Sequence, residues 1–175
     1  MINQGSVLSP IFFSLYLDDL LKKLRKAGLG CHISGEWFGA AGYADDLILM
    51  SPSREAMSEM LEICESYANE NNLVFSTDSN PSKSKSKCVF MCGKENVVYP
   101  KKLSLHGKEL PYVKHANHLG HELSQTCTMD QDIRIKKAKL IDASTEIRET
   151  FGFAKPAQVL KVIRVYASNY YGSML

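Results

Sequence analysis

The sequence predicts an α+β fold: a small antiparallel sheet with two helices packed on one face, followed by a helical segment. Apolar residues recur at helical spacing in two long segments before residue 75. Between these segments lies a stretch rich in β-branched and aromatic residues, which glycines divide into hairpin-sized pieces. After about residue 128 the periodicity is helical throughout. Antiparallel hairpins with helices on one side are typical of the α+β class.

The first helix is expected to begin at Ser9-Pro10, because a serine cap followed by a proline in the first turn is a frequent helix start. Leu20 and Leu24 belong to its apolar stripe, and Gly28 ends it. Residues 31–50 then predict strands, with a hairpin whose tip lies near Asp45.

A second helix is expected from Ser51-Pro52, with Met60 and Cys64 on its apolar face. Residues 73–75 predict a short strand. Residues 76–86 are polar and predict a loop. Two further short strands are expected, at residues 88–91 and at residues 102–110 with a turn at His106-Gly107.

The last third of the chain predicts two helices. From about Met129 an apolar face recurs at helical spacing, and Pro156 opens the final helix. The residues expected to share that apolar face are Ile133, Leu140, Ile141, Ser144, Ile147 and Phe151.

Charge and cysteine content narrow the class of protein. Residues 1–75 carry 5 basic and 10 acidic side chains, whereas residues 76–175 carry 16 basic and 9 acidic ones, so the second part suits contact with a polyanion. No long apolar run or basic-then-apolar leader is present, so we expect neither a membrane span nor secretion. The 5 cysteines are expected to be reduced thiols of an intracellular protein.

Adjacent carboxylates at a hairpin tip are the strongest chemical signal. Asp45 and Asp46 precede an apolar strand, and carboxylate oxygens suit Mg²⁺, which proteins typically hold with one or two carboxylates plus substrate phosphates. Two such ions clamp the attacking and leaving oxygens in phosphoryl transfer. The simpler interpretation is a turn dipeptide, since aspartate is favoured in turns.

The run Gln4-Gly5-Ser6-Val7-Leu8-Ser9-Pro10, the helix after it and Tyr43-Ala44-Asp45-Asp46 together resemble the reverse transcriptases of non-LTR, LINE-type retrotransposons. The similarity continues through residues 72–78, the lysine-serine run 83–87, a primer-grip-like hairpin at residues 118–121 and a thumb-like tail at residues 170–173. It implies a partial polymerase palm at residues 1–127 and the start of a helical thumb at residues 128–175.

The resemblance also implies roles for individual residues. Asp45 and Asp46 would bind Mg²⁺, two ions in a complete enzyme. Gln4 and Gly5 would line the nucleotide pocket, and Tyr43 would pack beside the primer end. Its partners would be an RNA template, a DNA primer and deoxynucleoside triphosphates.

A lysine after the second helix is thought to protonate the leaving pyrophosphate in such enzymes. Lys85 or Lys87 occupies that neighbourhood, and a solvated loop is the alternative for the run.

Tyr16-Leu17-Asp18-Asp19 has the same pattern as the acidic motif but lies within the first helical stripe. We therefore expect Asp18 and Asp19 to be solvent-facing helix residues.

The family's third carboxylate comes from a strand before the Gln-Gly loop, and only three residues precede Gln4 here. We therefore expect this chain alone not to polymerise nucleotides. Two other interpretations stay open: a non-catalytic nucleic-acid-binding remnant and a nonfunctional truncated product. Cys88, Cys92, His118 and His121 offer a zinc site as a further alternative, against buried thiols.

Overall fold

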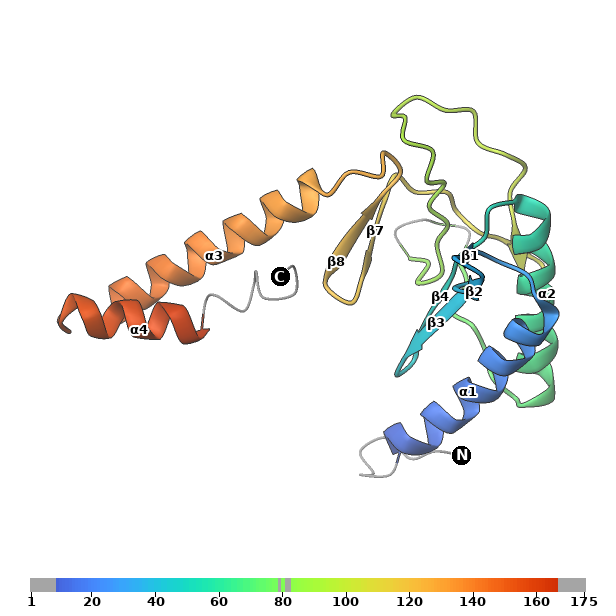
Figure 1. The fold of residues 1–175 in the computed structure, drawn as a ribbon, viewed down its shortest axis with the longest axis horizontal. Helices are drawn as coiled ribbons and strands as arrows, with labels where there is room; N and C mark the ends of the chain where they lie inside the picture. Colours follow the sequence, from blue (N-terminus) through green and yellow to red (C-terminus); the bar gives the residue numbers. More distant parts are fainter. Residues whose placement is uncertain (1–8, 79, 81–82, 167–175) are drawn as a thin grey trace. The chain divides into compact units, whose positions relative to one another are not determined.

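The computed structural model describes residues 9–78, 80 and 83–166. Gln4, Gly5 and the thumb-like tail at residues 170–173 lie outside the described residues. Within the described part the secondary structure is α+β with antiparallel strand pairs, as predicted (Figure 1). No helix of that part has the length and apolar character needed to cross a membrane.

The described chain divides into two compact units. Unit 1 contains the residues up to Phe90 together with Asn96–Lys114, and unit 2 contains Met91–Glu95 and the residues from His115 onward.

The strands of the described part form four separate two-stranded hairpins, so the expectation of one small sheet is wrong. Each pair joins neighbours in sequence: β1 with β2, β3 with β4, β5 with β6 and β7 with β8. Short turns make such local pairing easy, whereas joining the hairpins into one sheet needs pairing across long loops. Their bounds are β1 His32–Ile33, β2 Glu36–Trp37, β3 Ala40–Tyr43, β4 Asp46–Leu49, β5 Ser104–Leu105, β6 Lys108–Glu109, β7 His115–His118 and β8 His121–Ser124.

Helix α1 (Ser9–Ala27) confirms the first predicted helix. It ends at Gly28, whose φ of 67° suits glycine and whose N–H donates to Arg25 O. Leu20 and Leu24 are fully buried and form a core with residues of the second helix and of the β3–β4 hairpin. The expected apolar stripe therefore holds this helix against the hairpin.

Helix α2 (Arg54–Glu70) starts three residues later than expected. The side chain of Ser53 accepts a hydrogen bond from Ala56 N, so Ser53 is the N-cap in place of Ser51-Pro52. Both helices lie on the same side of the β3–β4 hairpin (Figure 1). The Tyr67 hydroxyl of α2 donates to Tyr16 O of α1 at 2.6 Å, which fixes the two helices against each other.

Two of the short strands expected from the sequence are absent. Residues 73–75 alternate as a strand would, with Leu73 and Phe75 packed on the core and Val74 88% exposed, yet they pair with no described strand. Residues 88–91 contribute only an isolated bridge from Cys88 to Tyr112. Alternating apolar residues determine which side of a segment is buried, but a strand also needs a neighbouring segment with which to form backbone hydrogen bonds.

The hairpin expected at residues 102–110 is confirmed by β5 and β6, with His106 and Gly107 at positive φ in the turn. Leu103, Leu105 and Leu110 are buried against Leu61 of α2 and form the second core cluster of unit 1. These contacts fasten residues 96–114 to the helix that also supports the β3–β4 hairpin.

Unit 2 contains the β7–β8 hairpin, helix α3 (Asp130–Thr150) and helix α4 (Pro156–Tyr166). Both predicted helices are confirmed. The apolar face predicted for α3 is only partly buried, since Ile133 is 40% and Ile141 53% exposed. The buried residues of α3 are Asp132 and Lys136, because the first turns of this helix meet β8 through charged side chains.

Candidate active site

Asp45 and Asp46 lie at the tip of the β3–β4 hairpin, as predicted. Tyr43 pairs with Asp46, which leaves Ala44 and Asp45 as a two-residue loop. Ala44 has a φ of 50°, a left-handed conformation that costs an alanine energy.

The other three hairpins of the described part also turn through two residues, and each places glycine second. Their loops are Ser34-Gly35, His106-Gly107 and Leu119-Gly120, all with both residues at positive φ. The β3–β4 loop differs because Asp45 stands where the others have glycine, and its φ is not positive. The turn geometry thus accommodates a carboxylate at the tip.

The two faces of this hairpin differ in character. Cross-strand partners share a face, and the pairs Ala40–Leu49 and Gly42–Leu47 face the core, since three of these residues pack on the core cluster. The pair Tyr43–Asp46 therefore belongs to the opposite face, where both side chains are exposed. The hairpin therefore carries the Asp46 side chain away from α1.

Gly42 is the point of close approach between the hairpin and α1. A Cβ at position 42 would lie 2.4 Å from Leu17 Cδ2 and 3.1 Å from Leu17 Cγ. Any side chain here would force the Leu17 side chain to move. The glycine of the Gly-Tyr-Ala-Asp-Asp run therefore allows Leu17 to pack directly on the strand that leads into the acidic tip.

The carboxylates fit a hard divalent cation. Asp45 and Asp46 are exposed, and neither is hydrogen-bonded or ion-paired to another described side chain, so their oxygens are available as ligands. Within the described residues no group of three or more His, Cys, Asp or Glu is arranged to hold a metal ion.

The lysine-serine run has two distinct sides. Ser84 is buried, and its hydroxyl accepts from Asp78 N and donates to Ser86 O. Lys83, Lys85 and Lys87 are all exposed. The run therefore presents three ammonium groups to solvent, and their exposure does not single out Lys85.

The second Tyr-x-Asp-Asp sequence is a surface feature of α1, as predicted. Asp18 is 53% and Asp19 69% exposed, and both pair with Lys22, at 2.6 Å and 3.7 Å. The hydrogen bond that Lys22 donates to Asp18 raises the pKa of Lys22. These two carboxylates are thus engaged with a cation of their own helix, in contrast to Asp45 and Asp46.

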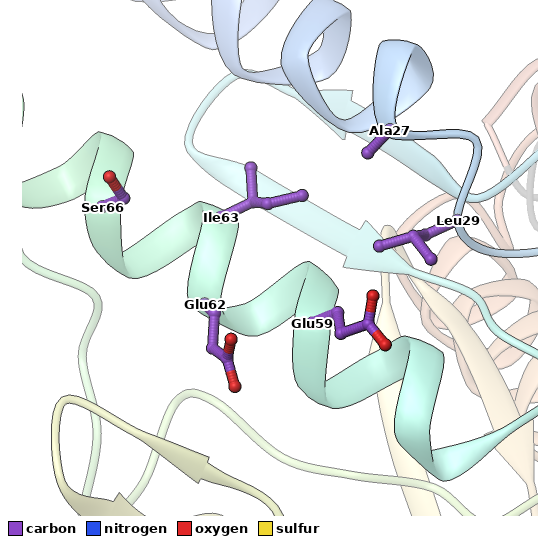
Figure 2. Close-up of a pocket in the computed structure, with 6 residues that line it drawn as sticks. All are labelled: Ala27, Leu29, Glu59, Glu62, Ile63 and Ser66. Carbon is purple, nitrogen blue, oxygen red and sulfur yellow. The ribbon is translucent and has the colours of Figure 1, made fainter.

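A shallow groove of unit 1 lies between α1 and α2, away from the candidate residues (Figure 2). Ile63 of α2 points toward Ala27 and Leu29, which close the opposite wall. None of the predicted site residues lines this groove. Its lining residues are Ala27, Leu29, Glu59, Glu62, Ile63 and Ser66.

The zinc alternative finds no support among the described residues, which include all four of its candidate ligands and contain no metal-binding group of three. Burial raises the pKa of the Cys88 thiol to about 11, which agrees with the alternative of a buried thiol. His121 is instead in contact with Lys136, since Lys136 Nζ donates to His121 Nδ1 at 2.8 Å.

A buried charge cluster in unit 2 was not predicted. Asp132 is 4% exposed, pairs with Lys136 at 2.8 Å, and accepts a hydrogen bond from Glu122 N. The hydrogen bond from Lys136 lowers the pKa of Asp132. The four-residue spacing of this pair was visible in the sequence, but such pairs are usually solvated.

Comparison with known families identifies the class of protein to which this chain, with its acidic hairpin, belongs. Residues 1–123 match the family model of the reverse transcriptase (RNA-dependent DNA polymerase). Because this match covers more than half of the chain, the protein belongs to the reverse transcriptase family.

The related proteins are retrotransposon polyproteins. The chain is 29% identical over 119 residues to the Retrovirus-related Pol polyprotein from type-1 retrotransposable element R2 of Nasonia vitripennis, a match that covers 66% of this chain and 11% of that protein. It is 36% identical over 61 residues to the Retrovirus-related Pol polyprotein from type-2 retrotransposable element R2DM of Drosophila melanogaster, covering 35% of this chain and 6% of that protein. The chain thus carries reverse transcriptase sequence of the retrotransposon type and aligns with a small part of each relative.

Proposed function

We propose that the β3–β4 hairpin is the catalytic hairpin of an RNA-directed DNA polymerase and that residues 1–127 are part of its palm. The observation that carries this proposal is the pair of exposed, unpaired carboxylates at a two-residue turn in a chain of the reverse transcriptase family. Residues 128–175 would begin the thumb.

In the complete enzyme the reaction is attack of the primer 3′ hydroxyl on the α-phosphorus of a deoxynucleoside triphosphate. The bond between the α- and β-phosphates breaks, and pyrophosphate leaves. Mg²⁺ supplies charge neutralisation at the phosphate oxygens. Asp45 and Asp46 supply the carboxylate ligands that position this charge, with Asp45 the stronger candidate because it occupies the tip itself.

The neighbouring residues take supporting roles in this proposal. Tyr43 lies on the same face as Asp46, is 67% exposed, and offers its ring to the end of the primer. Lys85 is exposed and would donate the proton that the leaving pyrophosphate needs. Gln4 and Gly5 would line the nucleotide pocket.

The substrates and partners proposed are an RNA template, a DNA primer and deoxynucleoside triphosphates, encountered inside the cell. A second candidate function is nucleic-acid binding without catalysis. The three lysines presented to solvent by residues 83–87 favour it, since exposed ammonium groups pair with phosphates without any metal. The two functions differ in their dependence on the acidic hairpin.

The metal proposal is tested by adding Mn²⁺ to the isotope-labelled chain and measuring paramagnetic broadening of amide resonances. We expect broadening centred on residues 43–47, displaced by excess Mg²⁺ and lost in Asp45→Asn. Asp19→Asn is the matched control, because it removes another exposed carboxylate elsewhere in unit 1. Broadening that Asp45→Asn leaves unchanged would rule out the metal site.

Polymerase activity is tested by primer extension on an RNA template with Mg²⁺. For the chain alone we expect no extension. A longer protein that contains this chain should extend the primer and lose extension in Asp45→Asn. Nucleic-acid binding that persists while extension is absent from both proteins would favour the second function.

A further inference from the structure

We propose that Cys92 and Cys127 form a redox-sensitive dithiol site in unit 2, which closes to a disulfide in the presence of a hydroperoxide. Cys92 Sγ and Cys127 Sγ each lie 3.9 Å from the same atom, Gln125 O. The two sulfurs are therefore within twice that distance of each other, although 34 residues separate them in sequence. This site is independent of the nucleotide chemistry proposed above.

Backbone contacts hold the two thiols in place. Residues 92–95, which we call the strap, lie against Gln125: Cys92 N and Gly93 N donate to Gln125 O at 3.0 Å and 3.1 Å. Gln125 Nε2 donates in return to Lys94 O and Glu95 O at 2.8 Å and 3.0 Å.

Gln125 is 2% exposed, so its end of these four hydrogen bonds is buried. The strap is thereby fixed next to the turn that contains Cys127. Bond formation requires the two sulfurs to turn toward each other by rotation about the Cα–Cβ bonds of Cys92 and Cys127.

Two of the other cysteines, Cys64 and Cys88, are poor competitors. Burial raises the pKa of Cys64 to about 12 and that of Cys88 to about 11, so both stay protonated at neutral pH, and the thiolate is the reactive form. Cys127 is exposed, which allows a small oxidant to reach it first.

The proposed chemistry has two steps. The Cys127 thiolate attacks one oxygen of the hydroperoxide, the O–O bond breaks, and an alkoxide or hydroxide leaves as a sulfenic acid forms. The Cys92 thiolate then attacks that sulfur, the S–O bond breaks, and hydroxide leaves. Two thiols are oxidised to one disulfide, while the hydroperoxide is reduced and its products take up the two thiol protons.

A consequence for unit 2 follows from the position of the strap. Its ends are next to the points where the chain passes between units 1 and 2, at Phe90–Met91 and Glu95–Asn96. A disulfide to Cys127 would fasten the strap to the segment that leads into α3, and it would restrict the unfolded chain between the two cysteines. Oxidation should therefore raise the thermal stability of unit 2.

The test treats the full reduced chain with hydrogen peroxide, blocks free thiols with N-ethylmaleimide, and maps disulfides by mass spectrometry of an unreduced digest. We expect the Cys92–Cys127 peptide to be the main cross-link, abolished by Cys92→Ser and by Cys127→Ser. Cys31→Ser is the matched control and should leave it unchanged. In concentrated urea the yield of the Cys92–Cys127 peptide should fall at least about tenfold, because only the folded strap holds the two cysteines close together.

Three results would overturn the proposed site. They are equal yields of disulfides between other cysteine pairs, a yield of the Cys92–Cys127 disulfide that urea does not lower, and oxidation of Cys127 to sulfinic acid without a cross-link. Thermal unfolding gives a separate readout. Peroxide should raise the Tm of the wild-type chain, dithiothreitol should reverse the change, and the Tm of Cys92→Ser should not rise. An unchanged wild-type Tm with the disulfide present would overturn the stabilising effect.

Discussion

Leu17 of α1 occupies the space that a side chain at position 42 would need, since a Cβ there would lie 2.4 Å from Leu17 Cδ2. The strand that leads to the acidic tip is therefore positioned by a leucine-glycine contact. Leu17 also packs on the buried core formed by α1 and α2. The catalytic hairpin proposed here thus depends on the helix that contains the second, surface-exposed Asp-Asp pair.

This contact predicts that Gly42→Ala lowers the free energy of unfolding by about 1–3 kcal/mol, the usual cost of overpacking. Urea denaturation measures the change. In a Leu17→Ala background the same substitution should cost much less, because the obstructing methyl group is gone. Equal costs in both backgrounds would show that the contact does not limit position 42.

The positive φ of Ala44 predicts that Ala44→Gly does not destabilise the chain and stabilises it by up to about 1 kcal/mol. Glycine adopts this conformation without strain, which offsets its greater freedom in the unfolded state. Ala41→Gly, in strand β3 of the same hairpin, is the control and should destabilise. Thermal unfolding that shows the same loss for both variants would contradict the strained turn.

The hydrogen bond from Tyr67 to Tyr16 O predicts that Tyr67→Phe costs about 1 kcal/mol of stability at neutral pH. Burial raises the pKa of Tyr67 above its ordinary value of 10.0. The folded state therefore disfavours ionised Tyr67, and its stabilisation is complete below pH 10.0 and declines as the pH rises through the folded-state pKa. The difference between wild type and Tyr67→Phe, measured by urea denaturation, should shrink across that range; a constant difference would argue against the buried hydroxyl.

The buried pair in unit 2 predicts that Lys136→Met costs about 3–5 kcal/mol, because Asp132 is left charged and buried. The double variant Asp132→Asn/Lys136→Met should be more stable than the single one, since an asparagine oxygen still accepts from Glu122 N. The pKa of Asp132 lies below its ordinary value of 3.8, so its contribution is present above pH 3.8 and is lost as the pH falls through the lowered value. Chemical denaturation from pH 7 to pH 2 measures both effects. A double variant that is less stable than Lys136→Met would refute the proposed pairing of Asp132 with Lys136.

The lysine-serine run predicts different results for its two possible roles. If Lys85 is the proton donor, Lys85→Ala in an extension-competent protein should slow nucleotide addition at least about tenfold, whereas Lys83→Ala should not. If the run only contacts phosphates, each of the three alanine variants should weaken binding by a similar, salt-dependent amount. Single-turnover extension and binding at two salt concentrations distinguish these results.

Local sequence signals predicted much of unit 1. The α1 stripe, the glycine after it and the hairpin turns are set by neighbours within a few residues, so their positions followed from periodicity and turn chemistry. The position of Asp45 at the hairpin tip was also predicted from neighbouring residues. The surface position of Asp18 and Asp19 also followed, because helical spacing separates them from the buried leucines.

Contacts between distant residues were not predictable in the same way. Residues 73–75 have the alternation of a strand but no partner, and Ser84 is buried in a run that looked uniformly polar. Asp132 and Lys136 have the four-residue spacing of an ordinary surface pair, yet they are buried where α3 meets β8. In each case the outcome depends on which segment lies opposite.

The motifs in the sequence by themselves determined the class of protein. The sequence also determined most of the helix and hairpin positions and the acidic tip, because backbone conformation responds to side chains a few residues apart. Only the tertiary structure decided that Leu17 packs against Gly42 and that Asp132 is buried with Lys136. It also decided that the sulfurs of Cys92 and Cys127 both lie near one carbonyl oxygen. These contacts join residues far apart in sequence, or bury a nearby pair against another element. Their energies arise from desolvation and close packing, which exist only once the chain has folded.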